Sequence, residues 1–181
     1  MATRSNPCFG ILKIESVAGL PIMSNSLRSH VRTAQITDLE LFWRWANDPV
    51  TRWNSFSPNE ISLKEHSEWF RRTIASPSSR IYVVELDDEP VGQVRFDKVS
   101  SDEAEIDVYI APEHRGRGLG TLALRLTREM ARKDLGIAGV IGIVKTSNPA
   151  SCAAFQKADF VESEGRIVKG HECRVFLWPP S

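Results

Sequence analysis

The segment whose residue types point most directly to chemistry is Val108–Thr121 (VYIAPEHRGRGLGT), where glycines recur at alternate positions between arginines. Glycine lets a backbone approach a ligand closely. A predicted strand enters this segment and an amphipathic helix leaves it, so the unpaired N–H groups at the helix start face the loop at the positive end of the helix dipole. Arg115 and Arg117 add positive charge. The segment therefore predicts a cradle for a pyrophosphate group, rather than a glycine-rich turn that only begins a helix.

The spacing of the glycines separates three phosphate-binding designs. A P-loop needs Gly-Lys-Ser/Thr, but Gly120 is followed directly by Thr121. A dinucleotide-binding fingerprint needs G-x-G-x-x-G and an acidic residue after the next strand, whereas this chain has glycines at 116, 118 and 120 and a next strand that ends in Val144-Lys145. Both an NTP-hydrolysing site and an NAD-type site are therefore disfavoured.

The third design carries a family resemblance. Arg115–Gly120, after a strand and a proline, resembles the R/Q-x-x-G-x-G/A acetyl-CoA loop of the GNAT superfamily of N-acetyltransferases. The resemblance implies an α+β fold with a mostly antiparallel, twisted sheet of about six to seven strands and helices on both faces. It also implies that the sheet is splayed between the fourth and fifth strands, at a bulge in the fourth, and that acetyl-CoA is the acetyl donor.

The resemblance assigns two groups of residues to the coenzyme. The backbone of Val108, Tyr109 and Ile110 would pair with the pantetheine arm, and the pyrophosphate would be held by Arg115, Gly116, Arg117, Gly118, Leu119, Gly120 and Thr121. The later segment 148–160 is similar to the family's N-x-x-S/A-x-x-x-Y-x-x-x-G-F, in which Asn148 would hydrogen-bond to pantetheine.

Two residues of this later segment depart from the family pattern. Phe155 replaces a tyrosine that often protonates the leaving thiolate, so that acid role is vacant or filled elsewhere. Asp159 replaces the glycine that usually ends the helix, which is a milder change because Asp tolerates the left-handed conformation better than most residues.

Carboxylates on the predicted fourth strand are the candidate catalytic bases. An alkyl ammonium with a pKa of about 10 is neutral in only about one molecule in a thousand at pH 7, so an amine acceptor needs a base or a chain of waters leading to one. Glu103, Glu105 and Asp107 share one face of the strand Glu103–Ile110. Glu103 is interpreted as part of a solvated face. Glu105 and Asp107 are equal candidates because both lie nearer the expected bulge.

The acceptor side is expected around residues 41–54 and on the second helix. One helical stripe, Leu39, Trp43 and Ala46, is compatible with core packing or with ligand contact, and Trp45 is out of phase with it. The residues that could bind an acceptor are Trp43, Arg44, Trp45, Asn47, Arg52, Trp53 and His66. Two alternatives stay open: the arginines could be solvated or paired with Asp38, Glu40 and Asp48, and His66 could be a surface residue.

Two runs on this side refine the resemblance. W-R-x-x-N-D-P, followed by S-L-K-E-H-x-x-W-F from Ser62 to Phe70, resembles the branch that acetylates nucleotide-linked amino sugars. A closely related branch, which acetylates protein N-termini, shares part of this pattern. The implied reaction is acetyl transfer from acetyl-CoA to a primary amine, with an amino-sugar nucleotide as the favoured acceptor. A protein N-terminal acetyltransferase and a non-catalytic acyl-CoA-binding module remain the alternatives.

The elements that must position these residues are predicted from caps and periodicity. Thr37 with Glu40, and Ser62 with Glu65, have the spacing of capping boxes that begin two helices, the first of which should end before Asp48-Pro49. The predicted strands are 31–34, 81–86, 91–99, 103–110, 140–144, 160–164 and 173–178, and the later helices are 119–135 and 149–158. Short polar turns join the second to fourth strands in an antiparallel meander.

Composition limits the remaining possibilities. The 181 residues carry 23 Lys plus Arg and 23 Asp plus Glu, so no net charge would gather nucleic acid or an anionic membrane. The 3 cysteines have no metal-ligand or disulfide pattern, which predicts a reducing, cytoplasmic setting and no metal. We expect residues 1–29 to be a poorly ordered extension and residues 30–181 to form a single domain. Its expected partner is a small-molecule amine acceptor, with no nucleic acid or membrane, and the chain is expected to be a monomer or homodimer.

Overall fold

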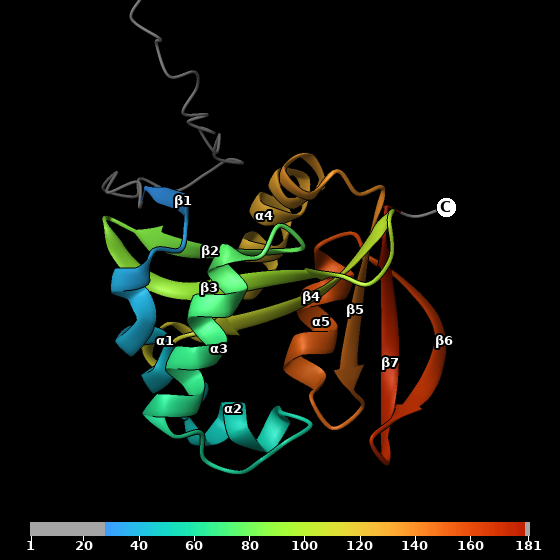
Figure 1. The fold of residues 1–181 in the computed structure, drawn as a ribbon. Coiled ribbons are helices and arrows are strands. Elements are labelled where there is room, and N and C mark those ends of the chain that lie inside the picture. Colours follow the sequence, from blue (N-terminus) through green and yellow to red (C-terminus); the bar gives the residue numbers. More distant parts are fainter. Residues whose placement is uncertain (1–27, 180–181) are drawn as a thin grey trace, which may run out of the picture.

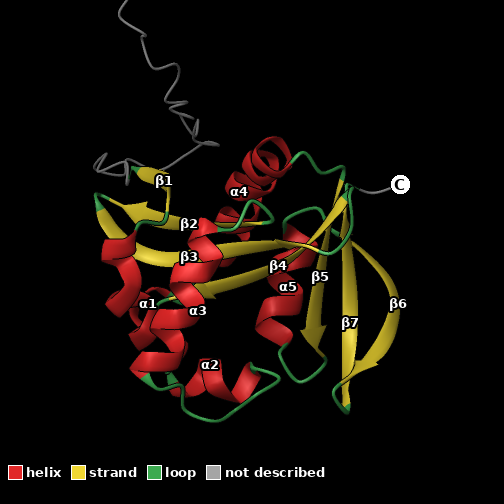
Figure 2. Cartoon of the chain, viewed as in Figure 1, coloured by secondary structure: helices red, strands yellow, loops and turns green. Residues whose placement is uncertain are grey.

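The computed structural model describes residues 28–179, and in this part of the chain the strands form one seven-stranded sheet of order β1-β2-β3-β4-β5-β7-β6. Helices pack on both faces of the sheet (Figure 1, Figure 2), which confirms the predicted fold class. The strands are β1 (Ser29–Thr33), β2 (Ser79–Leu86), β3 (Glu89–Lys98), β4 (Glu103–Ile110), β5 (Gly139–Lys145), β6 (Val161–Val168) and β7 (His171–Trp178). The helices are α1 (Leu39–Ala46), α2 (Pro49–Asn54), α3 (Leu63–Ala75), α4 (Leu119–Leu135) and α5 (Pro149–Lys157), with 3-10 turns at Ile36–Asp38 and Pro112–His114. The expectation for residues 1–29 falls almost wholly outside the described residues.

The antiparallel meander of β2, β3 and β4 divides the core into two layers. Alternate side chains of β2 point to opposite faces of the sheet. On one face, Ile81 and Val83 pack with Phe42 of α1 and Phe70 of α3. On the other face, Tyr82 and Val84 belong to the cluster that includes α4 and α5. The predicted turn between β2 and β3 is tight, with both Asp87 and Asp88 at positive φ. The α1/α3 layer and the α4/α5 layer therefore cover opposite faces of the same strands.

The sheet opens between β4 and β5, as predicted. These strands are parallel and pair only from Glu103 opposite Gly139 to Ile106 opposite Gly142, after which β4 continues to Ile110 and β5 to Lys145 without each other. Figure 1 shows the two strands diverging from that point. The expected bulge in β4 was wrong, because within the described sheet the β3–β4 register runs without a shift from Gly92–Ile110 to Lys98–Ala104. The opening arises because β5 diverges from a regular β4.

The helices that flank the opening end as expected. Gly136 ends α4 in the left-handed conformation at φ 62°, as a C-cap glycine does. Asp159, at φ 63°, takes the same conformation after α5, so this aspartate replaces the family's glycine in the geometry that glycine supplies. Arg128 of α4 donates to the carbonyl of Ala158, which holds α5 against α4.

The first helical region differs from the prediction. Thr37 is not an N-cap; a 3-10 turn occupies 36–38, and the Gln35 N–H donates to Asp38 Oδ2 at 2.7 Å. The Asp38 carboxylate also accepts two hydrogen bonds of 2.8 Å from Arg32. The helix that follows is rotated relative to the expected stripe, because its buried residues are Phe42 and Trp45. The Leu39–Trp43–Ala46 stripe is half-buried at the edge of this face, with Leu39 against the core, and Trp45, which was expected to be out of phase, is buried.

Asp48-Pro49 both ends α1 and begins a helix that the sequence did not predict. Asp48 Oδ2 accepts the Thr51 N–H at 2.9 Å, and proline at the first helical position is tolerated because its missing N–H would have no partner there. Helix α3 begins at the predicted capping box, where Ser62 Oγ accepts the Glu65 N–H. Three helices, rather than two, therefore separate β1 from β2.

Candidate active site

The glycine loop leads directly into α4 and leaves its backbone uncovered. Gly116 and Gly118 have φ values of 75° and 79°, which an L side chain rarely adopts. A Cβ on either residue would meet no described heavy atom within 4 Å. The N–H groups of Leu119, Gly120 and Thr121 have no acceptor inside the helix, because the first such bond runs from the Leu122 N–H to Gly118 O. These residues fit an anionic group.

The two arginines of this loop have different environments. Arg115 Nη2 lies 2.7 Å from Asp48 Oδ2, its Nε donates to Ile110 O at 2.9 Å, and its guanidinium stacks over the Tyr109 ring. The Arg117 side chain is exposed and has no ion pair or hydrogen bond within residues 28–179. In this structure the Arg115 side chain is engaged by Asp48 and Ile110, whereas the Arg117 side chain is free; the assignment of both residues to the pyrophosphate stays a prediction.

The residues predicted to bind the pantetheine arm lie on the strand and the helix that border the opening. Beyond Ile106, the β4 residues Val108, Tyr109 and Ile110 have β3 on one side and no strand on the other among the described residues. Asn148 begins α5, where its Oδ1 accepts the Ser151 N–H at 3.2 Å. Its amide NH₂ group has no described partner and could donate to a ligand. Both assignments to the coenzyme stay predictions.

Phe155 lies at the vertex of the opening. It is 2% exposed, stacks on Phe176 with ring centroids 5.3 Å apart and meets Phe160 edge-on at 5.0 Å. A Cβ on Gly142, the last β5 residue paired with β4, would lie 2.3 Å from the Phe155 ring. The position that often carries an acidic tyrosine is therefore part of the apolar core here and has no proton to give.

The two candidate bases differ in their surroundings. Glu105 is exposed on the same strand face, but partial desolvation by its neighbours raises the pKa of its carboxyl above the ordinary 4.5; Arg166 and Arg95 partly oppose this, and Asp107 adds to it. The Asp107 side chain is 66% exposed and lies 3.6 Å from Arg95 Nη2. A base near neutral pH needs a raised carboxyl pKa, so the structure favours Glu105 over its neighbour.

His66 of α3 and Arg52 of α2 lie on the face of the sheet that carries Glu105 and Asp107. His66 is 3% exposed, with its ring between Trp69 and Phe70, so it is not a surface residue. Its Nε2 and the Arg52 Nε are buried without a hydrogen-bond partner in the described chain. Burial lowers the pKa of His66, and the Arg52 charge, which also acts on Asp107, lowers it further. The imidazole is therefore neutral at pH 7 and has an unused nitrogen.

The other predicted acceptor residues serve the fold or lie elsewhere. Trp43 Nε1 donates to Ile61 O at 2.8 Å, and the Asn47 amide both accepts the Ile61 N–H at 2.8 Å and donates to Ile61 O at 2.9 Å. Trp45 is buried between Phe42 and Tyr109 and offers no open platform. Arg44 is exposed on the outer side of α1, and Trp53 is 76% exposed on α2.

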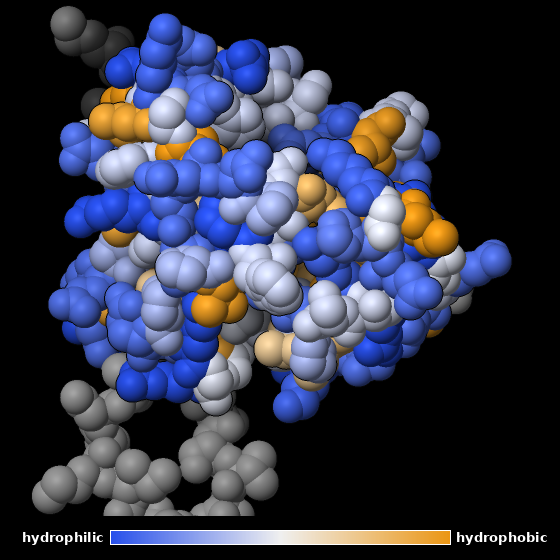
Figure 3. All heavy atoms as spheres, turned by 90° about the horizontal axis from the view of Figure 1, so that it is seen from below, coloured by the Kyte–Doolittle hydropathy of each residue, from blue (hydrophilic) through white to orange (hydrophobic). Residues whose placement is uncertain are grey.

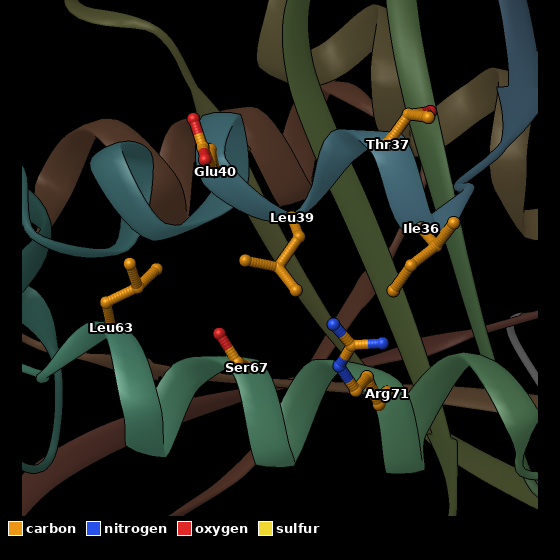
Figure 4. A pocket seen from close by; sticks show the side chains of 7 residues that line it. All are labelled: Ile36, Thr37, Leu39, Glu40, Leu63, Ser67 and Arg71. Atoms are coloured by element: carbon orange, nitrogen blue, oxygen red, sulfur yellow. The ribbon is translucent and has the colours of Figure 1, made fainter.

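Two surface hollows lie between α1 and α3. The larger, of about 400 Å³, is lined by Ile36, Thr37, Leu39, Glu40, Leu63, Ser67 and Arg71 (Figure 4). A smaller one of about 250 Å³ adds Trp43 and Arg44 and shares Glu40 and Leu63. Neither contains the glycine loop, the candidate bases or the edges of the opening. The chemistry of the chain therefore does not centre on these hollows.

Lys145 is a residue that sequence reasoning missed. It ends β5, is 7% exposed, and donates from Nζ to Ser55 O at 2.6 Å and to Trp53 O at 3.3 Å. Its ammonium also lies over the Phe56 ring, and it has no carboxylate partner among the described residues. The signal in the sequence was a lysine at the end of an apolar strand, and its only use there was to show that the acidic residue of an NAD-type site is absent.

Comparison with known proteins agrees with this geometry. A family model described as "Acetyltransferase (GNAT) domain" matches residues 28–161. The chain belongs to the GNAT acetyltransferase family. Spermidine N(1)-acetyltransferase of Escherichia coli (strain K12) is 31% identical over 121 residues, which are 65% of this chain and 64% of that protein. Mycothiol acetyltransferase of Corynebacterium efficiens is 29% identical over 150 residues, 77% of this chain and 47% of that protein. The chain thus spans less than two thirds of the length of these curated relatives.

Solved structures of GNAT enzymes share the fold. A Vibrio cholerae spermidine N-acetyltransferase in complex with CoA and spermine has a TM-score of 0.72 at 20% identity, over 82% of this chain and 94% of that one. AAC(6')-Ib in complex with ribostamycin and coenzyme A has a TM-score of 0.72 at 18% identity, over 82% and 92%. At these identities the likeness concerns the fold alone. Small-molecule amines are bound in both neighbours.

Residues 28–179 contain no group of three or more His, Cys, Asp or Glu that could hold a metal ion. None of their helices has the length and apolar character needed to cross a membrane. Cys152 and Cys173 are buried free thiols, and Cys8 lies outside the described residues.

Proposed function

We propose that this chain transfers an acetyl group from acetyl-CoA to a primary amine on a small acceptor, with a nucleotide-linked amino sugar as the favoured class. The observation that carries the proposal is the opening between β4 and β5, together with the carboxylate of raised pKa on β4 and the uncovered glycine loop that follows this strand. Acetyl-CoA would supply the acetyl group as a thioester, so that a C–N bond forms as the C–S bond breaks and the coenzyme leaves as a thiolate.

The donor side is supported by backbone geometry. The free N–H groups at the start of α4 and the exposed Arg117 would hold the pyrophosphate. The unpaired edge of β4 from Val108 to Ile110 would hydrogen-bond to the pantetheine arm, as a neighbouring strand would. This arrangement would fix the thioester beside Glu105 and Asp107, and such positioning contributes to the rate without further chemistry.

Glu105 is the proposed base. The attacking amine must lose a proton, and Glu105 would take it directly or through a water. Arg95 and Arg166 oppose the rise in its pKa, and their charges favour the ionised form that a base requires. No acid is proposed at Phe155; the leaving thiol has an ordinary pKa of about 8.5, so its thiolate can depart with little help.

Charge composition supports the amino-sugar nucleotide. The face around the candidate base combines Glu105 and Asp107 with Arg52, Arg95 and, by its effect on Glu105, Arg166. Carboxylates suit an amine and guanidinium groups suit a phosphate. A polyamine, which carries several positive charges, would meet these arginines unfavourably. A polyamine remains the second candidate acceptor, because a spermidine N(1)-acetyltransferase is 31% identical to this chain over 121 residues.

The experiment is an acceptor panel. Thiol release from acetyl-CoA would be measured with a nucleotide-linked amino sugar, spermidine, an aminoglycoside and a peptide with a free N-terminus. We expect the highest kcat/KM with the amino-sugar nucleotide. Higher turnover with spermidine would replace this acceptor with the second candidate, and tight acetyl-CoA binding without turnover of any amine would support a binding module instead.

A further inference from the structure

A groove that no described residue fills runs between α1 and α3. It consists of the two hollows of about 400 Å³ and 250 Å³, which share Glu40 and Leu63. Figure 4 shows Ile36 and Leu39 pointing towards α3, and Leu63 and Arg71 of α3 pointing back towards them. Because both helical segments supply its walls, we treat the two hollows as one surface and call it the α1/α3 groove.

The floor of the α1/α3 groove is apolar and open to solvent. Leu39 packs against the core cluster that contains Phe42 and Phe70, so the floor continues the core of this layer. Ile36 and Leu63, which also line the groove, are 44% and 42% exposed. On the lower face of the molecule, by contrast, Figure 3 shows hydrophobic side chains only as small patches among hydrophilic ones. Exposed apolar side chains that line one groove indicate a contact surface.

The rim of the α1/α3 groove carries charges of both signs. Glu40 and Arg71 line the larger hollow, and Arg44 lines the smaller one. Within residues 28–179 none of the three has an ion pair. A partner that fits this groove therefore combines apolar side chains with an acidic residue for the arginines and a basic residue for Glu40.

The chain itself contains a segment of this composition, which lies outside the described residues. The segment 9–23 (FGILKIESVAGLPIM) has two charged residues, Lys13 and Glu15. It has eight large apolar residues, which are Phe9, Ile11, Leu12, Ile14, Val17, Leu20, Ile22 and Met23. Contact of so many apolar side chains with water is unfavourable. The segment therefore matches the groove in apolar character and in the signs of its charges.

The connection between this segment and the fold is short. The described chain begins at Arg28, whose backbone is hydrogen-bonded to Asp87, and β1 then leads to the 3-10 turn that starts at Ile36. An extended chain covers about 3.3 Å per residue, so residues 24–28 reach about 17 Å, which is also the length of the five-residue strand β1. The segment before them can therefore enter the groove. Such a tether gives a millimolar effective concentration, at which a contact of about 0.1 mM affinity is about 90% formed.

We propose that residues 9–23 bind in the α1/α3 groove of their own chain and brace α1 against α3. This replaces the expectation of a poorly ordered extension for these residues. A second copy of the chain is a less suitable occupant, because it has no tether and a stable interface buries about 800 Å² on each partner, whereas charged residues such as Lys64 and Arg72 are exposed on α3. The proposal is independent of acetyl transfer, because the groove contains neither the glycine loop nor the candidate bases.

The test is photo-cross-linking in the full chain. The photo-reactive residue p-benzoylphenylalanine replaces Leu63, where the two hollows meet. Val161 is the control position, because it is 51% exposed and lies on β6, at the opposite edge of the sheet from β1. Mass spectrometry after illumination identifies the joined residues and shows whether the product has the mass of one chain or two. We expect position 63 to join residues 9–23 of the same chain, with at least tenfold less of this product from position 161.

Charged substitutions inside the segment should release it from the groove. Ile11→Asp/Ile14→Asp adds two carboxylates among its apolar side chains, and Ser5→Asp/Ser24→Asp is the control that adds the same charge outside residues 9–23. The first pair should lower the cross-link from position 63 at least fivefold, and the second should leave it within about twofold. Without the cross-linker, amide exchange in residues 36–46 and 63–71 should be up to about tenfold faster in the first pair, because a bound segment opposes local opening.

Three results overturn the proposal. A cross-link from position 63 with the mass of two chains would assign the groove to a second copy. Equal cross-linking from positions 63 and 161, or a cross-link that Ile11→Asp/Ile14→Asp does not weaken, would mean that the contact is not specific. Absence of the cross-link, together with equal amide exchange in the two pairs of variants, would mean that the groove stays open. None of these results bears on acetyl transfer, which the acceptor panel tests separately.

Discussion

The donor side and the acceptor side of the candidate active site are built in different ways. On the donor side, glycines 116 and 118 and the start of α4 form the binding surface from backbone atoms, and α4 is anchored by buried residues along its length, including Leu124 and Ala131. On the acceptor side, α2 has no buried residue, and its place depends on Asp48 and Lys145. The donor side is therefore fixed by the core, whereas the acceptor side depends on a few polar contacts.

This difference suggests how one fold can keep its donor and change its acceptor. A substitution in the donor loop alters a backbone conformation that only glycine adopts easily. A substitution at Asp48 or Lys145 alters a local contact and leaves the core intact. The predictions that follow, taken from the largest expected effect to the smallest, test whether the two sides separate in this way.

The largest effect is expected for Glu105→Gln, which removes the proposed base. kcat should fall by about a hundredfold or more, the usual contribution of a positioned base, with little change in acetyl-CoA affinity. Asp107→Asn should have a smaller effect, and Glu103→Gln, on the same strand face, is the matched control. Steady-state kinetics decide this: equal losses for Glu105→Gln and Glu103→Gln would rule out a specific role for Glu105.

The same substitution should change stability in the opposite direction. Because partial desolvation raises the folded-state pKa of Glu105 above its ordinary 4.5, folding disfavours the ionised form. The stability associated with the protonated carboxyl is present at low pH and lost as pH rises through the raised pKa. Because Glu105 is exposed and solvent screens its interactions, Glu105→Gln should raise Tm only slightly at neutral pH and have no effect under strongly acidic conditions. The kcat/KM of wild type should likewise rise with pH through a value above 4.5.

Gly118→Ala tests the donor side directly. A Cβ at φ 79° costs about 1–2 kcal/mol locally, and relief of this strain would distort the N–H groups that face the pyrophosphate. We expect acetyl-CoA to bind roughly tenfold more weakly by calorimetry. Gly136→Ala is the control, because Gly136 has a comparable left-handed conformation at φ 62° with open space around its Cβ, but lies at the opposite end of α4. Equal affinities in both variants would reject the glycine loop as the cradle.

Gly142→Ala tests how tightly the vertex is packed. Its Cβ would lie 2.3 Å from the buried ring of Phe155, which has Phe160 and Phe176 against it and little room to move. Overpacking of this kind costs about 1–3 kcal/mol, visible as a lower Tm or denaturation midpoint. Unchanged stability would mean that the Phe155 ring can shift to make room for the methyl group, and that the vertex is less tightly packed than the structure indicates.

The smallest effect is expected for Trp53→Ala. The Trp53 side chain is 76% exposed, and only its backbone carbonyl contacts Lys145. Stability should change by less than about 0.5 kcal/mol. The KM of the Trp53→Ala variant for the acceptor then distinguishes two roles of this residue. A higher KM would support direct contact of the indole with the acceptor. An unchanged KM would mean that Trp53 contributes only through its backbone carbonyl.

The sequence predicted what local backbone chemistry determines. Helix α4 with Gly136, the capping box of Ser62 and Glu65, and the strand Glu103–Ile110 were all expected, because periodicity and caps specify them within a few residues. The left-handed conformation of Asp159 was compatible with its residue type for the same reason. The glycine loop belongs to this group, which is why the donor side could be described before the fold was known.

The acceptor side was harder to predict because distant residues determine it. Trp45 contacts Tyr109 of β4, so tertiary packing rather than helical phase decides which face of α1 is buried. Arg115 reaches back to Asp48, 67 positions earlier, and Lys145 reaches Ser55, 90 positions earlier. No local pattern indicates such pairs. The charges of Arg115 and Asp48 were visible in the sequence, but their partnership was not.

The short parallel pairing of β4 with β5 has a consequence for the whole molecule. Within residues 28–179, strand pairing joins the β1–β4 half of the sheet to the β5–β7 half only from Glu103–Gly139 to Ile106–Gly142. A coenzyme lying between the diverging strands would occupy the position of a neighbouring strand and could hydrogen-bond to the backbone groups that β4 and β5 leave unpaired. Binding of the coenzyme should therefore stabilise the contact between the two halves of the sheet. We expect it to raise the Tm of the protein and to slow amide exchange at residues 107–110 and 143–145.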